Sequence, residues 1–333
     1  MASQRDPRLD SIKASLMFLV VFGHLLEGIK STAPLLSQIY DFLYLFHMPA
    51  FVFLSGYVIK DNQGVNYRTL VRHIIMPFIT LSVFYELLEL LINHQFSQYI
   101  RSGAPNWILW YLYSLIIWKL LLPIIMRLRF PLCWVLLASF AFSLLHFDGY
   151  AFGILRSVIF FPFFIAGNIA RENQYFSLTR WITKSYAPAA GVLILIIGYG
   201  VSLYLDTGLL YGSVTNASLG YTPLAGIMLR TLYYLAALGC IYAFCALTQA
   251  ATMLAQMGTR TLVIYGLHGP AVKFAFWPLI PNVHTPWQII ITSVTAILLT
   301  WLLSRDVAQK VFNSGTQWTG LLLMPRSYTE SGR

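Results

Sequence analysis

The stretch RLDSIKASLMFLVVFGHLLEG, residues 8–28, is a long apolar run with charged residues toward both ends. Its apolar part, roughly residues 12–28, is the first of ten such segments. Runs of this length with few charges predict membrane-spanning helices. The sequence therefore predicts an all-α, polytopic membrane helical bundle with about ten transmembrane helices. The other nine segments lie at roughly 42–59, 73–92, 107–125, 131–146, 153–170, 187–205, 227–247, 262–280 and 287–303.

The composition also indicates lipid as the solvent. Of the residues, 58% are hydrophobic and 10% are charged, whereas soluble domains carry about 25% charged residues. The net charge of +10 comes without a basic stripe of interleaved aromatic residues, so we expect no nucleic-acid partner. Cys133, Cys240 and Cys245 lie in apolar segments, which argues against a disulfide framework. No cysteine–histidine pair has zinc-ligand spacing, and we expect no metal.

The basic residues divide unequally between the two sides of this arrangement. The N-terminal segment, the even-numbered connections and the C-terminal tail hold sixteen of the 22 Lys and Arg residues. The opposite connections hold two, Lys30 and Arg101. Because cytoplasmic loops are enriched in Lys and Arg, we expect cytoplasmic N and C termini, a transmembrane domain over residues 1–305 and a cytoplasmic tail over residues 306–333. The sixteen are Arg5, Arg8, Lys13, Lys60, Arg68, Arg72, Arg127, Arg129, Arg171, Arg180, Lys184, Arg260, Arg305, Lys310, Arg326 and Arg333.

Two polar residues of the first segment share one helix face. Lys13 and His24 are eleven residues apart, which is almost three helical turns and about 16 Å along the axis. Asp10 lies within about 40° of the same face. Lys13 is then near the cytoplasmic boundary and His24 in the outer half of the membrane, where a histidine is a functional candidate. Glu27, one turn later, can orient the histidine ring, although a hydrogen bond that only joins two helices fits the spacing equally well.

The second segment and the connection after it contain further polar residues. Within FHMPAFVFLSGY, we favour a packing role, with Ser55–Gly56 allowing two helix backbones to approach closely. Arg68 and Arg72 are four residues apart and can form one cationic surface that suits phosphate groups. Anchoring at the cytoplasmic interface is the simpler alternative for this pair.

Two carboxylates, Glu86 and Glu89, lie one turn apart near the outer half of the third segment. Carboxylates at this depth must be paired, protonated or in contact with water. We therefore expect them to form ion pairs with Arg156 or Arg230, which lie near the outer ends of their own segments, or to line a pocket that opens outward.

Aromatic residues and a late histidine complete the candidates. The fourth segment opens with NWILWYLYSL, in which we assign Trp107 to an aromatic belt at the outer interface. Trp110 and Tyr111 are deeper and can stack on a sugar ring or close a channel. In the ninth segment, Tyr265 and His268 share a helix face. A Gly-Pro step directly after the histidine predicts an interrupted helix, which usually lines a cavity.

Six stretches, in order, resemble the membrane acyltransferase-3 family: RLDSIKASLMFLVVFGH, FHMPAFVFLSGY, RHIIMPF, ILWYL, IFFPFFIAGNIA and MGTRTLVIYGLHGP. The resemblance covers residues 8 to about 303 and is nearest to the fucose 4-O-acetylase-like branch. Members move an acyl group, usually acetyl, from cytoplasmic acyl-CoA to a carbohydrate or similar acceptor at the far face. The resemblance therefore implies an acyl-CoA-dependent O-acetyltransferase of the bacterial inner membrane, with acetyl-CoA as donor substrate and an envelope carbohydrate as acceptor.

The resemblance also implies roles for individual residues. The family pattern of a basic residue, ten residues and a histidine falls on Lys13 and His24, with Lys in place of the commoner Arg. It implies that Arg68 and Arg72, together with Lys13, bind the phosphates of acyl-CoA. His24 is then a general base or is transiently acylated. The other predicted site residues are Asp10 on the donor side, Glu27 beside His24, Ser55, Tyr265 and His268 for the oxyanion, and Trp110, Tyr111, Glu86, Glu89 and Arg156 for the acceptor pocket.

A transporter or flippase of a sugar or small molecule, without covalent chemistry, is the alternative function. The expected break in the ninth segment and the charges inside the membrane fit this class. The lack of a visible internal repeat counts against it. Binding of acetyl-CoA separates the two classes, because a sugar carrier has no reason to bind it.

Overall fold

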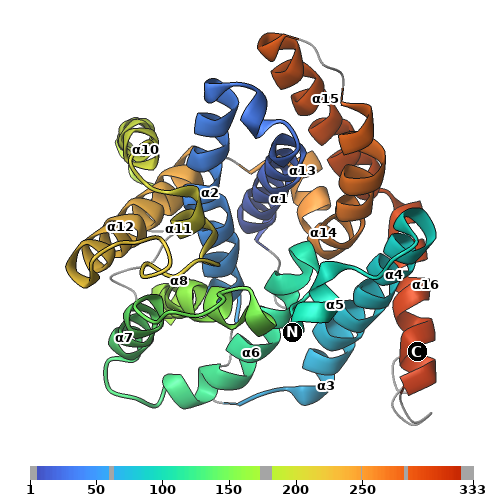
Figure 1. Cartoon of the computed structure of the whole chain (residues 1–333), viewed down its shortest axis with the longest axis horizontal. Helices are drawn as coiled ribbons and strands as arrows, with labels where there is room; N and C mark the ends of the chain where they lie inside the picture. Colours follow the sequence, from blue (N-terminus) through green and yellow to red (C-terminus); the bar gives the residue numbers. More distant parts are fainter. Residues whose placement is uncertain (1–5, 60–63, 173–181, 249, 281–283, 324–333) are drawn as a thin grey trace.

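The computed structural model describes residues 6–59, 64–172, 182–248, 250–280 and 284–323, which form helices joined by short connections with no strand among them (Figure 1). Several helices begin at a proline, whose fixed φ and missing N–H suit the first turn. The helices are α1 (Pro7–Glu27), α2 (Pro34–Tyr57), α3 (Tyr67–Leu70), α4 (Met76–Asn93), α5 (Gln98–Ser102), α6 (Trp110–Ile125), α7 (Pro131–Ser143), α8 (Ile154–Glu172), α10 (Ala187–Ser202), α11 (Thr207–Tyr211), α12 (Pro223–Leu247), α13 (Thr252–Gly258), α14 (Thr261–Pro270), α15 (Thr285–Leu303) and α16 (Asp306–Leu323).

Seven helical stretches of the described chain are long and apolar enough to cross a membrane. The apolar helices α7 and α10 are shorter. The predicted all-α class is confirmed, and each of the ten predicted segments overlaps a helix. The count of ten spans and the orientation of the termini stay predictions. The seven stretches are α1, α2, Tyr67–Asn93, Trp107–Ile125, Ala151–Glu172, α12 and α15.

Helix α1 lies inside the bundle and packs against α2, α13, α14 and α15 (Figure 1). Asp6 caps its N-terminus by accepting hydrogen bonds from the backbone N–H groups of Arg8 and Leu9, at 2.9 and 3.4 Å. Helix α2 runs antiparallel to α1, because only the six residues 28–33 join the two helices and Tyr44 in the middle of α2 lies beside His24 near the end of α1. The end of α2 and the start of α3 therefore lie at the same end of the bundle as the N-terminus.

Helices α2 and α8 cross with their backbones in contact at two glycines. A Cβ on Gly56 would overlap the carbonyl group of Phe164, and a Cβ on Gly167 would overlap that of Phe53. Small residues at a crossing are the usual means by which membrane helices pack closely. The predicted close approach at Gly56 is confirmed, and Gly167 is its counterpart on α8.

Two helical stretches contain π-helical turns, which are rare and occur frequently at functional sites. Turn η2 (Val71–Ile75) joins α3 to α4, and turn η5 (Ala271–Phe276) follows α14. The expected interruption after His268 is wrong, because α14 includes Pro270 and passes directly into η5. Membrane helices tolerate proline when neighbouring groups satisfy the freed backbone, and Pro49 and Pro162 likewise lie inside α2 and α8.

Residues 306–323 of the predicted tail form α16, which packs along the bundle. Thr80 on α4 donates a 2.8 Å hydrogen bond to Thr319, and Phe312 is buried near Gly266 of α14. Figure 1 shows α16 (red) beside α4 at one edge of the molecule. The rest of the predicted tail, residues 324–333, lies outside the described residues.

Candidate active site

A cavity of about 140 Å³ lies at the end of the bundle opposite the N-terminus of α1. A cavity of about 150 Å³ holds a molecule the size of benzene, so this one holds a single six-membered ring or a short acyl group. Its walls come from the end of α1, the middle of α2, the start of α8, and the connections that contain α5 and α11. The lining residues are Val20, His24, Glu27, Tyr44, Met48, Tyr99, Ala104, Pro105, Trp107, Ile108, Trp110, Gly149, Tyr150, Gly153, Arg156, Phe160, Leu210, Tyr211 and Tyr265.

His24 forms the wall contributed by α1. Its Nδ1 lies 3.2 Å from Glu27 Oε2, which confirms the predicted contact, and 3.5 Å from the Tyr44 hydroxyl. Its backbone carbonyl accepts a 3.1 Å hydrogen bond from Trp277 Nε1. When Nδ1 donates its proton to Glu27, Nε2 keeps a lone pair and can accept a proton. An imidazole oriented by a carboxylate in this way is suited to general-base chemistry.

Trp107 packs against the His24 ring, with the ring centroids 4.9 Å apart, and against Trp277 at 5.1 Å. Its φ of 30° is a backbone conformation that bulky residues rarely adopt. Strain of this kind persists where the surrounding structure enforces it, often at active sites. The interpretation of Trp107 as an interfacial belt residue is wrong, because the side chain lines the cavity.

Tyr265 and His268 reach the same region from α14, with the His268 ring 5.4 Å from that of His24. His268 is fully buried, and its Nδ1 lies 3.0 Å from the Ile264 carbonyl and 2.8 Å from the Tyr265 carbonyl. Nδ1 is therefore the protonated nitrogen, and Nε2 can only accept. The Tyr265 hydroxyl donates to the carbonyl of Ile108. Neither side chain has a free proton for an oxyanion, so the structure does not support that predicted role.

Ser55 and Tyr111 meet below the cavity. The Ser55 hydroxyl lies 2.6 Å from the Tyr111 hydroxyl and donates to the carbonyl of Phe51 at 2.7 Å. Ser55 is eleven residues from Tyr44 along α2, so it lies roughly 16 Å from the level of His24. Ser55 does not line the cavity around His24, as the predicted oxyanion role would require. The Tyr111 ring lies 5.5 Å from that of Tyr265, which lines the cavity, so the Ser55–Tyr111 pair lies between the cavity and the N-terminal end of the bundle.

Arg156 supplies the one cation among the described residues that line the cavity. Its guanidinium carbon lies over the rings of Trp110, Tyr150 and Tyr211, at 5.3, 5.4 and 5.6 Å. One terminal nitrogen lies 3.5 Å from the Ser213 hydroxyl, and the buried Nε has no hydrogen-bond partner in the described chain. Aromatic faces stabilise a cation without consuming its N–H groups, so Arg156 keeps donors for a bound molecule.

A second cation, Lys30, lies behind the cavity wall. Its ammonium group donates a 3.1 Å hydrogen bond to the Tyr211 hydroxyl and lies 4.2 Å from the centre of the Tyr40 ring. Burial lowers the pKa of Lys30, and the carboxylates of Glu27 and Asp41 oppose this shift. Lys30 thereby holds Tyr211 in the wall of the cavity.

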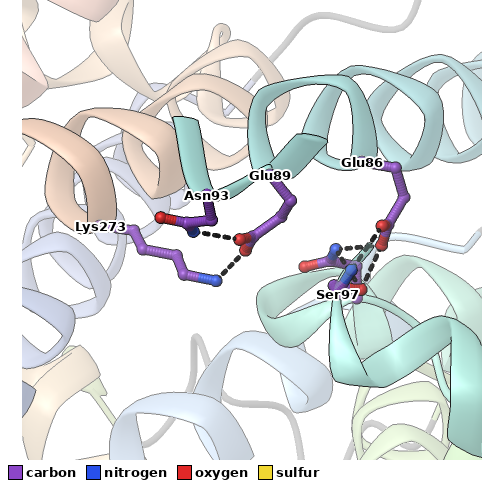
Figure 2. Close-up of polar contacts among 6 residues, drawn as sticks. Glu86, Glu89, Asn93, Ser97 and Lys273 are labelled. Carbon is purple, nitrogen blue, oxygen red and sulfur yellow. Dashed lines mark hydrogen bonds and ion pairs between the residues drawn. The ribbon is translucent and has the colours of Figure 1, made fainter. Parts of the chain in front are cut away.

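Glu86 holds the connection that carries Trp107 (Figure 2). Its carboxylate accepts a 3.0 Å hydrogen bond from the backbone N–H of Ser97, a second from the Ser97 hydroxyl and a 2.7 Å bond from Asn106 Nδ2. These partners lie at both ends of α5, so Glu86 closes this connection against α4. Glu86 does not line the cavity around His24, as the predicted acceptor role would require.

Glu89 is buried and forms an ion pair with Lys273 on η5 (Figure 2). It also accepts a 2.6 Å hydrogen bond from Asn93 Nδ2. The expected pairing with Arg156 or Arg230 is therefore wrong. Arg230 instead donates to the Leu209 carbonyl at 2.8 Å and to Asn216 Oδ1 at 3.0 Å.

The N-terminal end of the bundle carries the predicted phosphate-binding residues. Lys13 forms a 2.8 Å ion pair with Asp10. Arg68 on α3 and Arg72 on η2 are both exposed. The three cations are thus carried by two separate helical stretches at the end of the bundle that lies away from His24.

A second cavity, of about 470 Å³, lies next to α3 at this end. Of the described residues that line this cavity, Lys119 of α6 is the cation, and Asn66 and Thr69 add polar side chains. The cavity therefore places a positive charge beside the segment that carries Arg68 and Arg72.

A family model described as an acyltransferase domain matches residues 6–305. The chain belongs to the acyltransferase-3 family. As a member, it is a multi-pass membrane acyltransferase, as the resemblance implied. Nodulation protein NolL from Sinorhizobium fredii is 42% identical over 60 residues, which is 17% of this chain and 16% of NolL. No solved structure matches this acyltransferase.

Several residues around the cavity were not predicted from the sequence. Tyr150 and Tyr211 lie at the ends of short helices, where an aromatic residue usually indicates only a membrane interface, and Tyr44 lies in an apolar helix rich in aromatic residues. Trp277, which packs on Trp107, follows the Gly-Pro step by seven residues, and Lys119, which lines the second cavity, is an isolated charge in an apolar helix. An intramembrane lysine is a functional candidate by itself, so Lys119 is the residue that the sequence signals most clearly.

Proposed function

We propose that this acyltransferase moves an acetyl group from cytoplasmic acyl-CoA to a hydroxyl of a carbohydrate of the bacterial cell envelope, and that it lies in the inner membrane with about ten spans and both termini inside. The observation that carries the proposal is the oriented His24–Glu27 pair in one cavity, with a cationic cavity at the opposite end of the bundle. The sixteen-to-two distribution of Lys and Arg supports this orientation.

The chemistry follows from the protons that the structure leaves free. His24 Nε2 accepts the proton of the acceptor hydroxyl while the hydroxyl oxygen attacks the carbonyl carbon of the thioester. The carbon–sulfur bond then breaks, and the CoA sulfur leaves with the proton from Nε2. Glu27 stabilises the imidazolium that forms in between. Arg156 is the residue with free donors in the cavity, and we assign the oxyanion to it in place of Ser55, Tyr265 and His268.

The donor approaches from the opposite end. Arg68, Arg72, Lys13 and Lys119 offer positive charge to its phosphates. The pantetheine arm then passes the Ser55–Tyr111 pair and brings the thioester to His24. The acceptor sugar enters the cavity beside Trp110 from the far face. Membership of an acyltransferase family favours this reaction over the transporter alternative.

Replacing Lys119 with alanine is expected to raise the KM for acetyl-CoA about tenfold with little change in kcat, because a phosphate contact contributes equally to the ground and transition states. Arg72→Ala should also raise the KM for acetyl-CoA. Lys310→Ala, an exposed lysine on α16, is the matched control and should leave the KM unchanged. An unchanged KM in both Lys119→Ala and Arg72→Ala would remove this end of the bundle from the donor site.

The overall proposal is tested by mass spectrometry of envelope glycans from cells with and without the gene. We expect an O-acetyl group to disappear with the gene and to return with a plasmid copy. Binding of acetyl-CoA to the purified protein is the companion measurement. Identical glycans in both strains, together with no binding of acetyl-CoA, would contradict the proposal.

A further inference from the structure

A groove of about 390 Å³ lies beside the cavity and shares three wall residues with it, Glu27, Tyr99 and Trp107. Its other walls come from the connection between α4 and α5, from Lys273 on η5 and from Trp277. The two spaces are therefore neighbours across the Trp107 side chain. A ligand with one ring in the cavity and the next ring in the groove would lie across this shared wall.

The groove combines aromatic faces with hydrogen-bonding groups. Phe96 is 56% exposed, and Trp107 and Trp277 lie with their ring centroids 5.1 Å apart. Gln98 adds an exposed amide, and the Glu89–Lys273 pair adds charged groups of opposite sign (Figure 2). A sugar ring has an apolar C–H face and a rim of hydroxyl groups, which these two kinds of side chain complement.

The charges in the groove also exclude other occupants. The Lys273 side chain is 26% exposed although it is paired, so this wall presents charged atoms, which do not suit a lipid tail. Because Lys273 is neutralised by Glu89, the groove offers no unpaired cation of the described chain to an anionic group. A neutral, hydrated, ring-shaped ligand fits best.

We propose that the groove binds the second sugar residue of the acceptor, so that the enzyme acts on a glycan of at least two residues whose reacting residue occupies the cavity. This inference rests on the proposed acetyl transfer. The cavity has room for one ring, and the groove supplies contacts to the next. Glu86 acts here as a positioning residue, because it holds the connection that carries Phe96, Gln98 and Trp107.

The test uses the cells' own envelope glycan, freed of esters by mild alkali and separated into fragments of one, two and three sugars. Purified wild-type enzyme with acetyl-CoA should acetylate the two-sugar fragment with a kcat/KM about tenfold above that of the single sugar. Phe96→Ala and Gln98→Ala should abolish most of this advantage. Both variants should keep the wild-type rate on the single sugar, since neither residue lines the cavity around His24.

Phe84→Ala, which removes a partly exposed aromatic ring of α4 outside the groove, is the matched control. It should keep the higher kcat/KM for the two-sugar fragment over the single sugar. The inference is overturned if wild-type enzyme uses one- and two-sugar fragments equally well. It is also overturned if the groove variants lower the rates on both fragments by the same factor. No acetylation of any fragment by the wild type would contradict the proposed function itself.

Discussion

Substitution of His24 by alanine is expected to lower the rate of acetyl transfer about a thousandfold while the protein still folds. A positioned general base contributes about 10²–10⁴ to a rate, and in the proposed mechanism the contact with Glu27 orients the ring for this role. The measurement is transfer from labelled acetyl-CoA in membranes that contain equal amounts of each protein. The alanine side chain leaves the Trp277 hydrogen bond in place, because that bond is made to the backbone carbonyl.

Glu27→Gln is the graded companion to this change. The amide oxygen can still accept from His24 Nδ1, but the negative charge that stabilises the imidazolium is lost. We expect activity between those of the wild type and His24→Ala, lower than the wild type by about tenfold to a hundredfold. Transfer by His24→Ala close to the wild-type rate, at equal protein level, would remove His24 from the mechanism.

Replacement of Gly167 by alanine is expected to destabilise the folded protein strongly. The added Cβ would lie 2.8 Å from the carbonyl carbon of Phe53 and 3.0 Å from the backbone nitrogen of Tyr57, so α8 must move away from α2. Overpacking of a well-packed site costs about 1–3 kcal/mol, and a clash with backbone lies at or beyond the upper end of this range. The melting temperature of the purified protein in detergent is the measurement, and we expect it to fall by at least several degrees.

Gly200→Ala on α10 is the matched control for this prediction. A Cβ there meets no atom within 4 Å, and alanine favours a helix by about 1 kcal/mol over glycine. The melting temperature of this variant should equal or slightly exceed that of the wild type. If the two alanine variants melt at the same temperature, the crossing of α2 and α8 is not as close as described.

The fold was predictable because its information is local. Each apolar segment is continuous in sequence, and the eleven-residue separation of Lys13 and His24 sets their positions along one helix without reference to other helices. The Glu27 contact follows from the same helix geometry. What could not be predicted is that the helix continues past His268, since α14 includes Pro270 and passes directly into η5.

The site was predicted only in part because its remaining features depend on contacts between distant segments. Trp107 contacts His24 only because the connection before it folds back across α4, where Glu86 holds it. The protons of Tyr265 and His268 are engaged by backbone carbonyls, which no spacing rule reveals. Residue type alone therefore indicates Ser55, Tyr265 and His268 as donors to the oxyanion. Their hydrogen bonds in the structure instead leave Arg156 as the cavity residue with unused N–H donors.

The most direct test of acetyl transfer across the membrane uses sealed inside-out vesicles prepared from cells that express the protein. Acetyl-CoA labelled in the acetyl group is supplied only at the outer, formerly cytoplasmic, surface, and alkali-labile label on glycan in the lumen is counted. We expect label with the wild type and almost none with His24→Ala at equal protein level. Absence of luminal label with the wild type, or equal label with the variant, would contradict a reaction in which His24 passes cytoplasmic acetyl groups to a glycan on the far face.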